Sequence, residues 1–117
     1  MDTNVIKTKF EQAEQYLESA QNEMNRPAED VVPYMVCRSA RESISSYLMG
    51  FLLKNKVKFD EEDTTEDLLK KCQAVNNKFK DVDLSPLTFT KDYEYSAEIY
   101  EMENCIELAN YTKKLVD

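Results

Sequence analysis

The apolar residues of this chain recur mainly at intervals of three and four positions, which is the spacing of one face of an α-helix. The pattern is strongest in residues 30–55, which are also the most apolar segment. Pro33 suits the first turn of a helix, and Asp30 is the residue expected to cap it. We therefore predict one long central helix. Its main apolar face consists of Val36, Cys37, Ala40, Ile44, Tyr47, Leu48, Phe51 and Leu52.

Three other segments show helical spacing: one up to about residue 25, one at about 64–80 and one at about 93–116. Thr64 or Thr65 is the expected cap of the second of these. The first ends at Asn-Arg-Pro, and a short connection then leads to the central helix. Short connections favour antiparallel neighbours, so we expect the first two helices to pack side by side.

Two stretches between the predicted helices lack a helical period but contain isolated apolar residues. Val57 and Phe59 are the expected anchors of the polar loop after the central helix. Leu84, Leu87 and Phe89 are expected to anchor the stretch before the last helix beneath the bundle. The end of that stretch also fits a short extended piece.

The composition of the chain narrows its fold class. One glycine and three prolines among 117 residues are too few for the many turns of a sandwich or barrel. The length suits one modest hydrophobic core. We therefore predict a single domain, residues 1–117, with an all-α fold: an up-and-down bundle of four or five helices.

A line of small residues follows a second face of the central helix, namely Ser39, Ser43, Ser46 and Gly50. Small side chains allow another helix backbone to come close, either within the chain or across a dimer axis. Apolar or small residues cover nearly the whole circumference of this helix, which is more than three neighbours readily bury. We therefore predict a homodimer formed through the central helix.

The charge of the chain limits its partners. It has 15 basic and 23 acidic residues, a net charge of −8, which argues against broad binding to nucleic acid. The N-terminus has no apolar signal region, and no run approaches the 18 apolar residues of a membrane span. We expect a cytoplasmic protein that does not enter a membrane.

The three cysteines, Cys37, Cys72 and Cys105, each fall within an apolar helical pattern. Their number is odd and their spacing is not paired. We expect reduced core residues, and neither a disulfide framework nor a zinc site.

The chain contains no histidine, and this absence excludes several common kinds of catalytic site. Catalytic triads and Cys–His dyads need an imidazole, as do the usual di-iron carboxylate bundles. A single glycine cannot form a glycine-rich phosphate loop. We therefore assign no catalytic residue, no metal ligand and no cofactor, and predict that the protein is not an enzyme.

Arg41 is the unusual residue of the central helix because it lies inside the apolar arc, between Leu48 and Leu52. A buried guanidinium needs a carboxylate or another acceptor. Arg38 lies roughly 60° away on the helix, and Glu42 lies one turn after Arg38. We predict that Arg38, Arg41 and Glu42 line a polar pocket for a nucleotide or another anion.

A structural interpretation of Arg41 stands beside this one. Six acidic residues and no basic residue lie between positions 92 and 112. One of these carboxylates would neutralise Arg41 in an ion pair, and the acidic face would otherwise be solvated or bind a basic partner protein.

Residues 40–48, with Ala40, Glu42, Ile44 and Leu48, resemble the second helix of HEPN domains. The family pattern there is an alanine, a glutamate two positions on, and a following leucine or isoleucine before a leucine-rich turn, here with Leu52. The opening helix and the close at residues 105–109 are also similar to the family. The resemblance implies an up-and-down bundle that often dimerises.

The HEPN family includes metal-independent ribonucleases, often toxins paired with a nucleotidyltransferase antitoxin, and non-catalytic members that bind nucleotides or proteins. The nucleases carry an arginine and a histidine near the start of the last helix, and residues 90–95 contain neither. Ser46 replaces a common lysine, and Thr64 or Thr65 replaces a frequent histidine. The resemblance therefore implies a non-catalytic binding module. The alternatives are a divergent HEPN ribonuclease or toxin–antitoxin component that uses Arg38, Arg41 and Glu42, and a purely structural accessory subunit.

Overall fold

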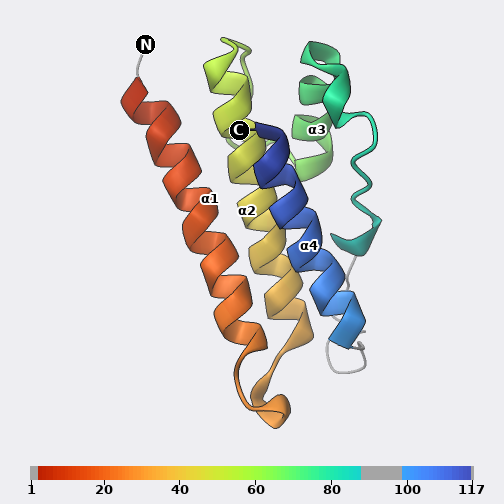
Figure 1. Cartoon of the computed structure of the whole chain (residues 1–117). Coiled ribbons are helices and arrows are strands. Elements are labelled where there is room, and N and C mark those ends of the chain that lie inside the picture. The colour runs from red at the N-terminus through yellow and green to blue at the C-terminus, as the bar shows by residue number, and fades with distance from the viewer. Residues whose placement is uncertain (1–2, 88–98, 117) are drawn as a thin grey trace.

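The computed structural model describes residues 3–87 and 99–116. These residues form four α-helices: α1 (Thr3–Met24), α2 (Pro33–Lys54), α3 (Thr65–Val75) and α4 (Ile99–Val116). Three short 3-10 turns lie in the connections: η1 (Ala28–Asp30), η2 (Asn77–Phe79) and η3 (Ser85–Leu87). Helices are the only regular elements in the two described ranges, so the predicted all-α class is confirmed (Figure 1).

Helices α1 and α2 are antiparallel neighbours, as their short connection predicts (Figure 1). The Ser43 hydroxyl donates a hydrogen bond to the Ala13 carbonyl at 2.8 Å. A Cβ atom on Gly50 would lie only 2.6 Å from the Phe10 ring, so the glycine leaves room for this ring of α1 to pack against α2. Ser43 and Gly50, two members of the small-residue line of α2, therefore serve packing within the chain. The homodimer stays a prediction.

Helix α3 runs in the same direction as α2, not opposite to it (Figure 1). Thr65, the first residue of α3, shares a 2.7 Å hydrogen bond with Ser45. Cys72, two turns later in α3, donates to the Leu48 carbonyl at 3.7 Å, further along α2. The loop at residues 55–64 carries the chain back along α2 before α3 begins.

Helix α4 also runs parallel to α2 (Figure 1). Cys37 near the start of α2 meets Cys105 in the first half of α4. Near the other end, Tyr47 donates to Glu14 Oε1 at 2.9 Å, and Lys113 of α4 pairs with the same oxygen at 2.7 Å. The predicted up-and-down order is therefore right for α1 and α2 and wrong for the rest of the bundle.

Cys37 and Cys105 are joined in a disulfide that links α2 to α4, with their Cα atoms 5.4 Å apart. The prediction of three reduced cysteines is wrong for this pair. The two residues are 68 positions apart, so local spacing gave no sign of their contact. Cys72 is a free, buried thiol, and burial raises its pKa to about 12. The cytoplasmic location stays a prediction.

The start of α2 differs in detail from the prediction. Asp30 lies in η1, and Val32 occupies the N-cap position without a side-chain hydrogen bond. Pro33 is the first helical residue, as expected for a residue without a backbone N–H. The Glu23 carboxylate of α1 accepts a hydrogen bond from the Val32 amide at 3.0 Å, which joins the end of α1 to the start of α2.

The capping prediction for α3 is confirmed at Thr64. Its hydroxyl accepts from the Asp67 amide at 3.0 Å, and the Asp67 carboxylate accepts from the Thr64 amide at 3.3 Å. The helix ends at Val75 rather than near residue 80, because Asn76 leaves the helical conformation and caps η2. The predicted start of the last helix near Tyr93 lies outside the described residues.

Helix α2 contributes more core residues than any other described helix. Its fully buried side chains include Ile44, Tyr47, Leu48 and Leu52. The predicted anchors Leu84 and Leu87 are buried against the core, and Val57 and Phe59 are partly buried against it. Phe89 lies outside the described residues. None of the described helices is both long enough and apolar enough to cross a membrane.

Candidate functional site

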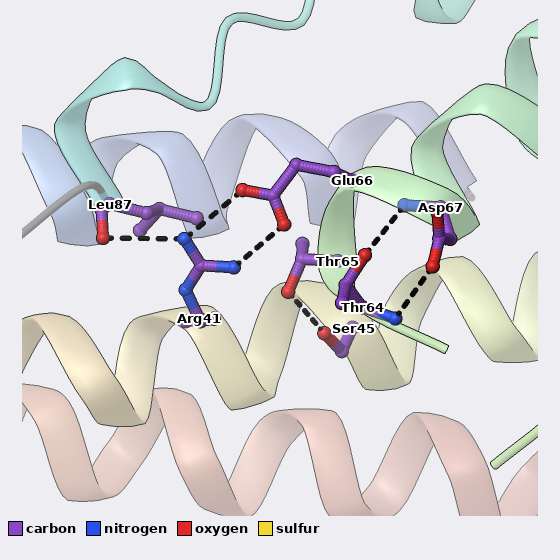
Figure 2. Close-up of polar contacts among 7 residues, drawn as sticks. All are labelled: Arg41, Ser45, Thr64, Thr65, Glu66, Asp67 and Leu87. Atoms are coloured by element: carbon purple, nitrogen blue, oxygen red, sulfur yellow. Dashed lines mark hydrogen bonds and ion pairs between the residues drawn. The ribbon is translucent and has the colours of Figure 1, made fainter. Parts of the chain in front are cut away.

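Arg41 extends from α2 to the first turn of α3. Its Nη1 lies 3.1 Å from Glu66 Oε1, and its Nη2 lies 3.3 Å from Glu66 Oε2 (Figure 2). Nη2 also donates to the Leu87 carbonyl at 3.3 Å. The hydrogen bonds from Arg41 hold the pKa of the Glu66 carboxyl below its usual value, against an opposing effect of burial. The arginine therefore connects α2, α3 and η3.

The local sequence around Glu66 explains why its carboxylate faces Arg41. The capping box of Thr64 and Asp67 sets where α3 begins, and Thr65 contacts Ser45 on α2 (Figure 2). Glu66 follows directly, so its backbone is held from both sides. The acid that pairs with Arg41 thus comes from α3, and not from the acidic segment that the sequence suggested as an alternative.

Arg38 and Glu42 lie one turn apart on α2, and both are exposed. Neither makes a hydrogen bond or ion pair with any of the described residues. Arg41 instead has partners on α3 and η3. The three candidate residues thus share one turn of α2 but not one set of partners, and their role in ligand binding stays a prediction.

Glu42 stands at the edge of a polar hollow of about 460 Å³ between α1, α2 and the loop at residues 55–64. We call this the α1–α2 hollow. Its volume lies within the range of small-molecule sites. Met49 contributes an apolar patch among polar groups. The lining residues are Lys9, Gln12, Gln15, Tyr16, Ser19, Glu42, Ser45, Ser46, Met49 and Glu61.

Charges in the α1–α2 hollow do not cancel. Lys9 pairs with Glu61 Oε1 at 2.9 Å, and this contact joins α1 to the loop. Glu42 is the remaining charged residue of the lining. The hollow therefore carries one net negative charge, from two carboxylates and one ammonium group.

Ser46 is the most informative residue of the α1–α2 hollow. It is only 7% exposed, yet its hydroxyl has no hydrogen-bond partner in the described part of the chain. No fully buried side-chain oxygen of the described residues lacks a hydrogen-bond partner, so the Ser46 oxygen must remain accessible. Ser46 lines the hollow, so its hydroxyl is available to a molecule bound there.

The hollow is not among the predictions from the sequence, because Ser46 falls on the line of small residues expected to pack against another helix. A signal was nevertheless present on α1, where Gln12, Gln15 and Ser19 recur at three- and four-residue spacing beside the apolar stripe. Amide and hydroxyl side chains on such a line differ from the charged residues that usually cover a solvated face.

The other polar clusters have structural roles. Glu14 links α1 to α2 and α4, and the hydrogen bonds from Lys113 and then Tyr47 lower its pKa despite burial. Lys71 pairs with Asp63 and holds the loop against α3. Within residues 3–87 and 99–116, no group of three potential ligands is placed to hold a metal ion.

Comparison with known proteins does not identify a function for the α1–α2 hollow or for the contacts of Arg41. The chain matches no protein-family model, no curated protein and no solved structure.

Proposed function

We propose that this chain is a non-catalytic, HEPN-like binding module whose ligand occupies the α1–α2 hollow. The observation that carries the proposal is Ser46, a residue that is only 7% exposed, lines the hollow and has a hydroxyl without a hydrogen-bond partner among the described residues. Around it, side chains from α1, α2 and the loop present both donors and acceptors to one space.

Arg41 supports this choice over a site centred on the arginines. Its guanidinium already has a carboxylate and a carbonyl as acceptors, so an anion would have to displace Glu66. The α1–α2 hollow has no such internal competitor at Ser46. A ligand that binds Ser46 would therefore not have to displace an ion pair.

A thermal-shift screen of the full chain tests the proposal. The panel contains nucleotides, sulfate, free amino acids, polyamines and simple sugars, because a bound ligand raises the melting temperature. Gln15→Trp places a bulky ring in the hollow, and we expect it to abolish the shift caused by any hit. Asn22→Trp is the control, since Asn22 is an exposed neutral residue of the same helix that does not line the hollow.

Two results would contradict the proposal. One is a panel in which no compound changes the melting temperature. The other is a hit that responds equally in the Gln15→Trp and Asn22→Trp proteins, which would place the ligand elsewhere. A nucleotide or sulfate hit that is lost in Arg38→Ala but kept in Gln15→Trp would instead support the predicted arginine site.

A further inference from the structure

We infer that the α1–α2 hollow selects a small organic cation, a molecule with one ammonium or guanidinium group and further hydrogen-bonding groups. This inference rests on the proposed function, because it names the ligand class of the same site.

The carboxylates of the hollow come from two different elements. Glu42 projects from α2, and Glu61 belongs to the loop. Lys9 occupies Glu61 Oε1, whereas Glu61 Oε2 and both Glu42 oxygens accept no hydrogen bond from the described residues. Carboxylate oxygens accept strong, charge-assisted hydrogen bonds from ammonium and guanidinium groups. An anion would meet these carboxylates without a free cationic group to offset them.

Neutral groups complete the site for a polar cation. Gln12 and Gln15 supply amide oxygens and nitrogens from α1, and the Ser46 hydroxyl supplies one more group from the α2 side. The Tyr16 ring and the Met49 thioether offer apolar surface for a short carbon chain, and an aromatic face also attracts a cation. The volume of about 460 Å³ suits a molecule of this kind rather than a folded partner.

The net charge of the chain also favours a cationic ligand. At −8, the chain draws cations towards its surface and repels anions, an effect that weakens as salt is added. Binding through Glu42 should therefore become weaker at high ionic strength.

Two near-isosteric probes test the charge requirement. N-acetylarginine amide carries a guanidinium group, and N-acetylcitrulline amide carries a neutral urea in its place. We expect the first to shift the NMR signals of the Ser46 backbone amide and the Gln12 and Gln15 side-chain amides. We expect the second to bind about tenfold more weakly, the usual effect of removing one charge-assisted hydrogen bond.

Three single variants test which side chains take part in binding the cation. Glu42→Gln keeps the size of the side chain and removes its charge, and it should weaken binding of N-acetylarginine amide about tenfold. Glu18→Gln makes the same charge change at an exposed position of α1 that does not line the hollow, and it should leave binding unchanged. Ser46→Ala should also weaken binding, with melting curves showing that the fold is kept.

The outcomes separate the inference from the proposed function. Equal binding of the two probes, or equal effects of Glu42→Gln and Glu18→Gln, would overturn cation selection while a polar ligand site remains. Shifts from neither probe would also overturn it, and a hit from another class in the thermal-shift panel would then keep the proposed function. Failure of both experiments would remove the site itself.

Discussion

The guanidinium of Arg41 and the carboxylate of Glu66 meet at two points, with N–O distances of 3.1 and 3.3 Å, across the contact between α2 and α3. Arg41 also reaches the Leu87 carbonyl, so one side chain joins three segments that are distant in sequence (Figure 2). The pair is partly exposed, at 28% and 48% of the two side chains. Arg41 was a candidate for ligand binding in the sequence. In the structure its contacts connect α2, α3 and η3.

Replacement of Arg41 should lower stability modestly. We expect Arg41→Met to reduce the free energy of unfolding by about 1 kcal/mol, because solvent screens a partly exposed pair. Urea unfolding of the two single variants and the Arg41→Met/Glu66→Gln double variant measures the coupling. Additive effects in the double variant would show that the two side chains do not stabilise each other.

The stabilisation provided by the Arg41–Glu66 pair should decrease as the pH is lowered. The pKa of Glu66 is lowered in the folded state, so its stabilising effect is fully present above the unfolded value near 4.5 and is lost as the pH falls through the folded pKa. The stability difference between wild type and Arg41→Met should therefore shrink at low pH. Unfolding curves at pH 7 and at pH 3 test this, and a difference that grows on acidification would contradict it.

The disulfide should make the protein sensitive to reduction. A crosslink that closes a loop of this length stabilises a fold by about 4 kcal/mol in the chain-entropy treatment, often less in practice. We expect a phosphine reductant to lower the melting temperature of the wild type by several degrees. Cys37→Ser should show no further decrease, whereas Cys72→Ser should respond like the wild type.

Mass spectrometry under non-reducing conditions provides an independent measurement. The intact protein should be two hydrogen masses lighter than its fully reduced form, with Cys72 as the one cysteine open to alkylation after unfolding. Three alkylated cysteines without a reductant would show that the disulfide does not form.

The purified protein should not degrade RNA. The expectation follows from the absence of histidine and of the Arg…His pair that HEPN nucleases use. Incubation with single-stranded RNA, with and without divalent metal, is the measurement. Cleavage that disappears in Arg41→Ala would favour the divergent-nuclease alternative.

Association through α2 requires a test that avoids the α1 contact. Gly50 is packed against Phe10, so a bulky residue there would disturb the fold, and the small-residue line is unsuitable as a probe. Met35 is 40% exposed on α2 and offers a better position. We expect a dimer at tens of micromolar in sedimentation experiments, and weaker association with Met35→Glu.

The same experiment has a clear negative result. At tens of micromolar, an interface of about −8 kcal/mol would be largely formed, so a protein that sediments only as a monomer would refute the predicted homodimer. Val75→Glu is the matched control, because Val75 is similarly exposed but belongs to α3.

Local chemistry in the sequence was sufficient to predict the helices and several of their ends. The periodicity of residues 30–55 identified the central helix, and Thr64 was one of two proposed caps because its hydroxyl satisfies a nearby amide. Isolated apolar residues such as Leu84 were correctly expected to anchor loops. Each of these features depends on residues within a few positions of one another, so a single sequence contains the necessary information.

Only the tertiary structure decided the features that join distant positions. The direction of α3 and α4, the partner of Arg41 and the Cys37–Cys105 disulfide all depend on contacts across 20 or more residues. The α1–α2 hollow likewise needs α1, α2 and the loop in place at once. Helical periodicity determines which face of a helix is buried, but many neighbours can cover one apolar face. The choice among them depends on packing and side-chain pairing over the whole chain.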